Sequence, residues 1–158
     1  MADNVVLPSL ANYVKTLFIN EKKISHDANE YKEKIDIKTP SVDQTLKNLS
    51  GGNQQKVVVA KWLIRNCDIL IFDEPTRGID VGAKSEIYRL MNALVREGKS
   101  IIMISSELTE IFRMSDRILV MSSGRRTAML PIEEADQHVV MKHAVQYSRL
   151  ISSGSEAV

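Results

Sequence analysis

The sequence of 158 residues holds one cysteine, almost no net charge and no long apolar run. A lone Cys67 cannot form an internal disulfide, which fits a reduced, cytoplasmic setting. A formal net charge of +1 gives no electrostatic reason to expect a nucleic-acid partner. The apolar runs are far shorter than the ~20 residues that span a bilayer, and Met1-Ala2-Asp3-Asn4 lacks the basic-then-apolar layout of a secretory signal. Any membrane role is therefore expected to be peripheral, through a partner.

The spacing of apolar residues predicts a helical first part followed by alternating strands and helices. Residues 9–39 show helical spacing, and Thr39-Pro40-Ser41 should end that part. Short apolar runs of strand length follow at 68–72, 100–105 and 117–121, and helices are expected at 57–65, 81–97, 107–114 and 133–147. Strands without polar alternation are typical of parallel sheets covered on both faces. The chain is therefore predicted to be an α/β protein with a parallel, doubly wound sheet and an N-terminal helical lobe.

Three local expectations follow from this pattern. Gly98 lies where a glycine ends helices in the left-handed conformation. Trp62 belongs to a helix that is apolar on most sides, so it is expected to pack in the core. Residues 117–121 should turn at Ser122-Ser123-Gly124 toward a further extended segment at 125–130.

The first candidate site is the octet Leu49-Ser50-Gly51-Gly52-Asn53-Gln54-Gln55-Lys56. Gly51 and Gly52 would let the backbone approach an anion closely, and a helix that begins near Asn53 would point its free N–H groups and positive dipole end the same way. Ser50 could cap that helix or donate to a phosphate oxygen. A plain capped helix start is the alternative, because Ser-Gly-Gly alone is common. The complete octet is much more specific.

The second candidate site is the run Ile69-Leu70-Ile71-Phe72-Asp73-Glu74-Pro75. Asp73 ends an apolar strand at the carboxyl edge, where open parallel sheets bind ligands, and it suits a magnesium ion held directly or through water. Pro75 is expected to restrict Glu74 to an extended conformation. Because adjacent strand residues point opposite ways, Glu74 could polarise a water that attacks a phosphate, a role that contributes about 10²–10⁴-fold. The alternative, that both carboxylates cap the next helix, is disfavoured by the octet upstream.

These two runs, in this order and at this spacing, resemble the signature motif and the Walker B strand of the ATP-binding-cassette (ABC) ATPases. The resemblance covers nearly the whole chain, from about Leu7 to about Val145. The resemblance is to a particular subfamily, because the octet is followed by Asp-Glu-Pro-Thr-Arg-Gly-Ile-Asp-Val-Gly-Ala-Lys and then by Ile-Ser-Ser-Glu-Leu. That succession is similar to the second cassette of the monosaccharide-importer ATPases, such as the ribose, galactose and xylose importers, in which two cassettes lie in one polypeptide.

The resemblance implies that two cassettes close head to tail around ATP and Mg²⁺. The contact with ATP held by the other cassette would include Ser50, Gly51, Gly52 and Gln54. Of these, Ser50 and Gly52 would meet the terminal phosphate of that ATP. Asp80 would lie in the D-loop, which touches the partner cassette, and from the residues alone it is a helix N-cap.

For ATP held by this cassette, Asp73 would serve the metal and Glu74 the attacking water. Ser106 occupies the position where ABC ATPases usually carry the switch histidine. Serine is shorter and cannot carry a positive charge, so Ser106 departs from the superfamily, although the sugar-importer subfamily shares Ser-Glu here.

The motif Gly-x-x-x-x-Gly-Lys-Ser/Thr occurs nowhere between Met1 and Val158. The chain is therefore expected to be a partial P-loop NTPase cassette that lacks the phosphate-loop part. Residues 1–66 would form the helical lobe with the signature motif, residues 67–150 the part of the RecA-like core from Walker B onward, and residues 151–158 a frayed tail. Alone, such a chain is expected to bind ATP weakly and to hydrolyse little.

The resemblance also implies partners at the cytoplasmic face of the membrane. These are permease subunits, the other cassette and, indirectly, a periplasmic or extracellular sugar-binding protein. One alternative is a truncated, non-catalytic cassette that docks to a permease or another cassette, which the absent phosphate loop and Ser106 favour. The Asp73-Glu74 pair and the unbroken octet favour an ATPase. A second alternative, an ABC protein of translation or DNA repair, is disfavoured because Arg77-Gly78-Ile79-Asp80 is unlike the Asn-His-Leu-Asp run of the translation factors.

Overall fold

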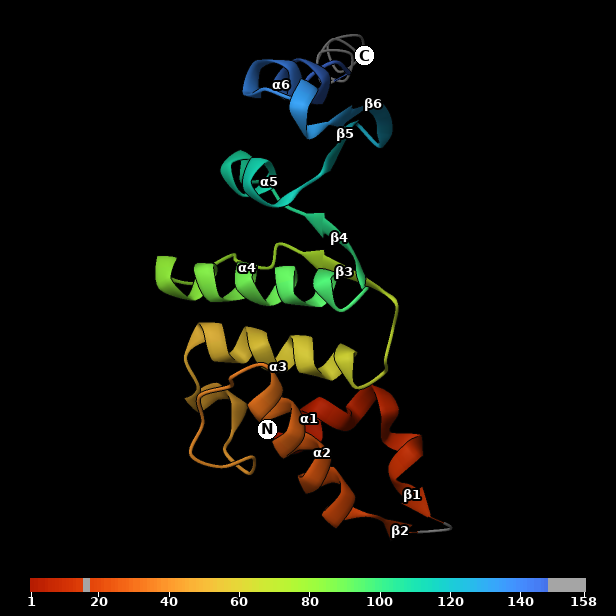
Figure 1. Cartoon of the computed structure of the whole chain (residues 1–158), viewed down its shortest axis with the longest axis vertical. Coiled ribbons are helices and arrows are strands. Elements are labelled where there is room, and N and C mark those ends of the chain that lie inside the picture. The colour runs from red at the N-terminus through yellow and green to blue at the C-terminus, as the bar shows by residue number, and fades with distance from the viewer. Residues whose placement is uncertain (16–17, 148–158) are drawn as a thin grey trace, which may run out of the picture. The chain divides into compact units, whose positions relative to one another are not determined.

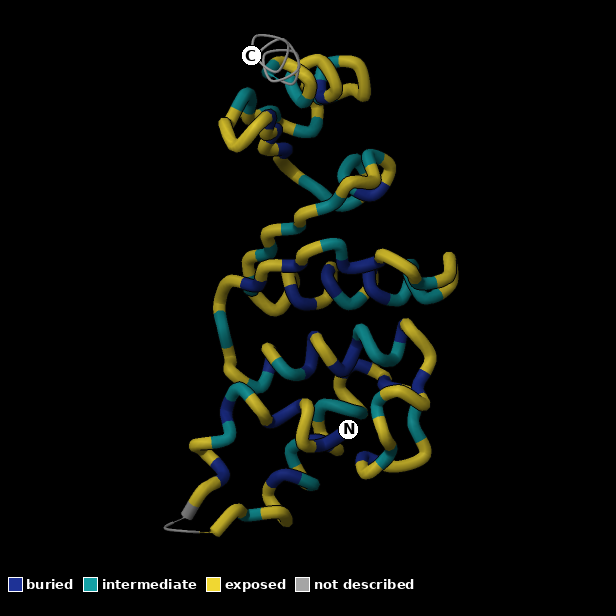
Figure 2. Tube along the Cα trace, turned by 180° about the vertical axis from the view of Figure 1, so that it is seen from behind, coloured by how far each residue is buried: buried dark blue, intermediate teal, exposed yellow. Residues whose placement is uncertain are grey.

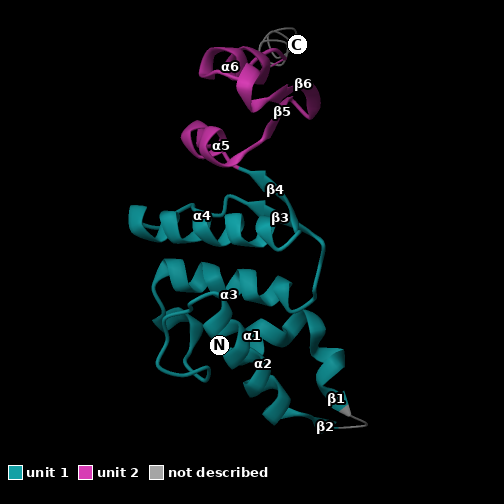
Figure 3. Ribbon diagram, in the orientation of Figure 1, with its two compact units in different colours: residues 1–104 teal, residues 105–158 magenta. Residues whose placement is uncertain are grey.

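The computed structural model describes residues 1–15 and 18–147, and the expected tail at 151–158 lies outside them. The chain divides into two compact units, which meet in sequence at Ile104 and Ser105 (Figure 3). The predicted boundary between residues 66 and 67 stays a prediction. None of the described helices is long and apolar enough to cross a membrane.

The first unit contains most of the helices and the parallel strands (Figure 1). Its elements are α1 (Ala2–Val6), η1 (Leu7–Tyr13), β1 (Val14–Lys15), β2 (Phe18–Ile19), α2 (Glu21–Lys34), η2 (Leu46–Asn48), α3 (Gly51–Leu63), β3 (Ile69–Asp73), α4 (Val81–Arg96) and β4 (Ser100–Ile104).

The N-terminal lobe is less uniformly helical than predicted. Val14 pairs with Ile19 in a short antiparallel ladder, and α2 begins only after Asn20, whose side chain accepts a hydrogen bond from the Lys23 N–H. An asparagine cap of this kind fixes a helix start. The helical spacing seen from residue 9 onward therefore does not correspond to helix at Val14–Lys15 and Phe18–Ile19, where the chain is extended. Val5 of α1 is fully buried, in a helix that packs on α2 and α3.

Helices α3 and α4 pack on each other through one buried side of each, which Figure 2 shows in dark blue. The helix predicted at 81–97 is confirmed as α4, and its buried residues include Ile87, Met91 and Leu94. Gly98 ends the turn after α4 at φ +89°, also as predicted. Trp62 on α3 is 49% exposed, so its predicted core position is wrong. The buried side of α3 faces the neighbouring helices, and Trp62 lies away from it.

Strands β3 and β4 form a parallel ladder in which Ile69 pairs with Ser100 and Asp73 with Ile104. The parallel pairing confirms the predicted α/β class. The prediction that the sheet is covered on both faces is wrong for the described residues, because exposed and buried residues alternate along β3. Leu70 is buried, whereas Ile71 is 67% exposed. One face of this ladder is therefore packed and the other is open and apolar.

The second unit contains α5 (Leu108–Met114), β5 (Arg117–Ser122), β6 (Arg125–Pro131), η3 (Ile132–Glu134) and α6 (Gln137–Ala144). Ser123 and Gly124 both have positive φ, as two-residue hairpin turns require, so β5 pairs antiparallel with β6. The predicted hairpin is confirmed. The last helix is shorter than predicted, because Asp136 is extended and its side chain caps α6. The buried core of this unit includes Ile118, Val120 and Val140.

Candidate functional site

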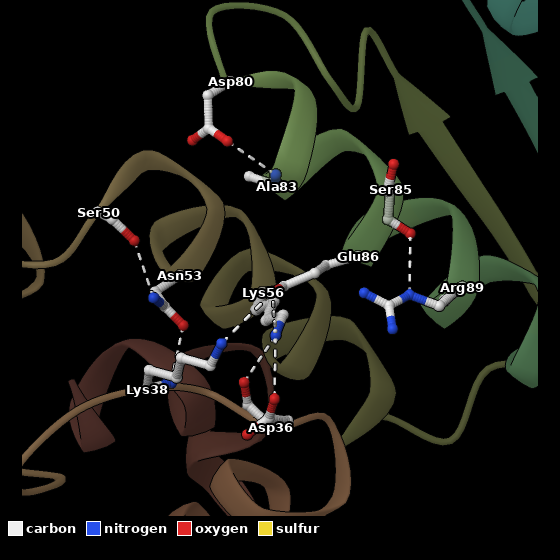
Figure 4. Close-up of polar contacts among 10 residues, drawn as sticks. All are labelled: Asp36, Lys38, Ser50, Asn53, Lys56, Asp80, Ala83, Ser85, Glu86 and Arg89. Atoms are coloured by element: carbon white, nitrogen blue, oxygen red, sulfur yellow. Dashed lines mark hydrogen bonds and ion pairs between the residues drawn. The ribbon is translucent and has the colours of Figure 1, made fainter.

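Helix α3 begins directly after Ser50, which is in the extended conformation at φ −61° and ψ 155°. The Ser50 side chain makes no hydrogen bond to the backbone of the helix. Instead, its Oγ accepts a hydrogen bond of 2.8 Å from Asn53 Nδ2 (Figure 4). Of the two roles that the sequence left open for the Ser50 hydroxyl, helix capping is therefore not the one adopted here.

The two glycines of the octet differ in their surroundings. Gly52 is buried, and a Cβ added to it would lie 2.7 Å from the Cβ of Ala83 on α4. Real Cβ atoms do not approach so closely, so glycine is required here for the packing of α3 on α4. Gly51 is exposed, and a Cβ there would lie 3.2 Å from Ile79 Cγ2. Gln54 Nε2 donates to the Leu49 carbonyl at 2.8 Å. Ligand contacts of these three residues stay predictions.

A surface hollow of about 250 Å³ joins the octet to the predicted D-loop. It is lined by Lys38, Ser50, Gly52, Asn53, Asp80, Gly82, Ala83 and Glu86. Asp80 is the N-cap of α4, because its Oδ1 accepts the Ala83 N–H at 2.9 Å, as predicted. The hollow therefore brings hydrogen-bond donors at the start of α3 close to a carboxylate at the start of α4.

A network of charged residues that sequence reasoning missed lies beside this hollow (Figure 4). Lys56 is only 4% exposed, and its Nζ lies 2.9 Å from a Glu86 carboxylate oxygen and 2.7 Å from the Asp36 carbonyl. The Glu86 carboxylate also meets Lys38 Nζ at 3.4 Å. The hydrogen bond and charge of Lys56 hold the pKa of Glu86 below its usual value, and Lys38 adds to that effect. This network ties the octet to α4.

One signal in the sequence could have placed Lys56 inside. Gly52, Lys56, Ala60 and Leu63 recur at helical spacing, and they fall on one side of α3, which is buried. A lysine in that series needs a carboxylate partner. The sequence gives no sign that the partner is Glu86.

The carboxylate pair lies at the carboxyl end of the parallel ladder, as predicted. Asp73 is the last residue of β3 and is exposed. The Glu74 N–H donates to the Ile104 carbonyl at 2.9 Å, and its carbonyl accepts the Arg77 N–H at 3.2 Å. Glu74 has φ +47°, so the extended conformation predicted for it is wrong. The turn that begins here requires a left-handed residue, at a cost on the order of 1–3 kcal/mol that is typical of functional sites.

Ser106 is exposed in the turn between β4 and α5, within the second unit. Its neighbour Ser105 is more constrained, because the Ser105 hydroxyl donates to the buried Glu110 carboxylate at 2.5 Å and accepts the Glu107 N–H at 3.0 Å. The turn that carries Ser106 is therefore held by hydrogen bonds within the second unit. Asp73 and Glu74 belong to the first unit.

Known proteins resemble this chain in sequence over nearly its whole length. Residues 2–77 match the family model described as ABC transporter. The chain is 53% identical, over 96% of its length, to the "Putative ribose/galactose/methyl galactoside import ATP-binding protein 3" of Burkholderia ambifaria. The chain belongs to the ABC transporter family. The resemblance predicted from its motifs is therefore confirmed.

A second relative is similar in sequence, and a solved structure is similar in fold. The "Ribose import ATP-binding protein RbsA" of Clostridium tetani is 50% identical over 94% of the chain. The chain spans 30% of the length of each of these two relatives. A solved structure of an ATP-binding cassette of an ABC transporter shares the fold, with a TM-score of 0.74 and 20% identity, over 90% of this chain and 61% of that one. In this family member the octet lies at the start of α3, and the carboxylates Asp73 and Glu74 lie at the end of β3.

Proposed function

We propose that this chain is part of the ATP-hydrolysing subunit that energises import of a monosaccharide across the cytoplasmic membrane. One observation carries the proposal. Asp73 and Glu74 lie at the carboxyl end of a parallel ladder, with Glu74 held in a left-handed turn, in a chain 53% identical to an import ATP-binding protein. The subunit would lie at the cytoplasmic face of the membrane, bound to permease subunits that receive sugar from a binding protein.

The residues of this chain would divide between two ATP molecules. For ATP held by its own cassette, Glu74 would accept a proton from the attacking water. The exposed Asp73 carboxylate fits an oxygen-ligated cation and would hold Mg²⁺, which supplies positive charge beside the phosphates. For ATP held by the other cassette of a head-to-tail pair, Ser50 would donate its hydroxyl hydrogen to the terminal phosphate. Asp80 would meet the partner cassette near that phosphate.

A second candidate function is a cassette that docks without catalysis. The serine at position 106, which cannot carry a positive charge, favours it. Such a protein would bind the permease or another cassette through the same fold, but its carboxylates would have no effect on ATP turnover.

Substitution of Glu74 by glutamine separates the two functions. In the importer assembled from this polypeptide, its permease and any further cassette, Glu74→Gln should lower the rate of ATP hydrolysis about 10²–10⁴-fold, because the base is lost. ATP binding should be unchanged. Glu33→Gln, which changes an exposed glutamate on α2, is the matched control and should hydrolyse ATP at the wild-type rate.

The docking function predicts a different result. Glu74→Gln would then leave ATP hydrolysis unchanged, while removal of the whole chain would still abolish sugar uptake. The chain by itself is expected to bind ATP weakly, so tight binding of Mg²⁺ and ATP by the purified 158 residues would contradict a partial site.

A further inference from the structure

We infer that Asn53 is a positioning residue that turns the Ser50 hydroxyl hydrogen away from the protein, where it can be donated to an anionic oxygen. The inference rests on the proposed function, in which Ser50 meets a terminal phosphate. It concerns the residue that follows Ser-Gly-Gly in the octet and gives its side chain a specific task.

The orientation of the Asn53 amide is fixed by its other partner. The Lys38 backbone N–H lies 2.7 Å from Asn53 Oδ1. A backbone N–H can only donate, so the atom that faces it must be the amide oxygen. The amide nitrogen then faces Ser50 Oγ, at 2.8 Å (Figure 4).

This orientation decides how the Ser50 hydroxyl is used. An amide NH₂ group only donates, so Ser50 Oγ must receive that bond in a lone pair. The hydroxyl hydrogen of Ser50 therefore points elsewhere. Within residues 1–15 and 18–147, no hydrogen bond has Ser50 Oγ as its donor. Because Ser50 is exposed and lines the hollow, its hydrogen is available to a ligand there.

The charged network holds the partner of Asn53 in place. Lys56 Nζ bonds the Asp36 carbonyl at 2.7 Å, and the next residue, Ile37, is 3% exposed. Lys38 follows directly, with its ammonium 3.4 Å from Glu86. The Lys38 N–H that orients Asn53 is thus held in place by the burial of the preceding residue, by the hydrogen bond from Lys56 and by the ion pair with Glu86. Pre-positioning of this kind lets a hydroxyl bind an anion without first giving up another bond.

Substitutions at positions 50 and 53 test the inference in the assembled importer. Ser50→Ala should lower ATP hydrolysis about 10- to 100-fold, as expected for the loss of a hydrogen bond to a charged group. Asn53→Asp should give a loss of similar size. Its carboxylate still accepts the Lys38 N–H, but it also accepts from Ser50 and so withdraws the hydroxyl hydrogen from the ligand.

The combination of substitutions distinguishes positioning from a separate contribution. If Asn53 acts through the Ser50 hydroxyl, Asn53→Ala should lower hydrolysis in the wild-type background and add nothing to Ser50→Ala. Two effects that simply multiply would overturn the inference and leave the proposed function standing. Wild-type hydrolysis by Ser50→Ala would overturn both the inference and the proposed contact of Ser50 with phosphate.

Two controls address the fold. Asn29→Asp makes the same chemical change on the exposed side of α2, where Asn29 bonds only its own helix, and ATP hydrolysis should be unchanged. Trp62 is the single tryptophan and lies on α3, so its fluorescence reports whether the helix that follows Ser50 is intact. Asn53→Asp should unfold at the wild-type temperature. Wild-type hydrolysis by a folded Asn53→Asp protein would overturn the inference.

Discussion

Substitution of Glu86 by glutamine tests whether the buried Lys56 ammonium depends on its carboxylate partner. The change keeps the shape of the side chain and removes its charge. Lys56 is 4% exposed, so its ammonium cannot turn to water when the carboxylate is lost. The substitution therefore leaves a positive charge in the interface between α3 and α4 with weaker partners.

The expected cost follows from the geometry of the pair. Removal of one partner from a fully buried ion pair costs about 3–5 kcal/mol. Glu86 is 32% exposed, and the Asp36 carbonyl remains 2.7 Å from Lys56 Nζ, so part of that cost is avoided. We expect Glu86→Gln to lower the free energy of unfolding by about 2 kcal/mol. Lys56→Met removes the desolvated charge itself, so it should cost less, about 1 kcal/mol.

The pH dependence has a definite sign. Because Lys56 holds the pKa of Glu86 below the ordinary value of 4.5, the folded state favours the charged carboxylate more than the unfolded state does. The stability from this pair is fully present above that unfolded pKa and is lost as the pH falls through the lower, folded pKa. The difference between wild type and Glu86→Gln should be constant near neutrality and shrink below pH 4.5.

Chemical unfolding followed by Trp62 fluorescence measures this difference at α3. The matched control is Glu97→Gln, which breaks the Lys34–Glu97 pair at 3.0 Å. Both side chains of that pair are almost half exposed, so the control should cost no more than about 1 kcal/mol. If Glu86→Gln cost no more than the control, or if its effect persisted undiminished at about pH 3, well below the ordinary carboxyl pKa of 4.5, the assignment of a stabilising buried pair would be refuted.

Two further substitutions probe local packing. Gly52→Ala should destabilise the protein by about 1–3 kcal/mol, because the new Cβ would lie 2.7 Å from the Cβ of Ala83. Thermal unfolding measures the loss, and added Ala83→Gly should restore part of it; no restoration would contradict the contact. Ser105→Ala should cost about 1–3 kcal/mol, because it removes the hydroxyl that donates to buried Glu110 and accepts the Glu107 N–H. Amide hydrogen exchange should quicken in α5, and unchanged exchange there would argue against this role.

Helix α4 shows what the sequence could predict. Its buried residues Ile87, Met91 and Leu94 follow the helical period, and Gly98 adopts the left-handed conformation expected after a helix. Both signals are local, because they depend on spacing within one segment and on the backbone freedom of one residue. The parallel pairing of β3 with β4 was predictable for a related reason, since a helix between two apolar runs favours it.

Other features depend on what an element packs against, which spacing alone does not reveal. Trp62 and Ile71 are apolar, yet they are exposed, because the faces of α3 and β3 that carry them have no cover among the described residues. Glu74 adopts a left-handed conformation where the chain leaves the ladder and enters a turn in which the Glu74 carbonyl accepts the Arg77 N–H. The pairing of Lys56 with Glu86 likewise joins two helices that are far apart in sequence.

Most side chains of the octet that the structure describes make contacts within the protein, and the exception is the hydroxyl hydrogen of Ser50. Gly52 is required by helix packing, Gln54 bonds a backbone carbonyl, and Lys56 is buried in an ion pair. Asn53 bonds the backbone on one side and the Ser50 hydroxyl on the other. Ser50 itself is exposed and does not cap its helix. A plain capped helix start would use that hydroxyl as the cap, so the arrangement favours a ligand as the acceptor of its hydrogen.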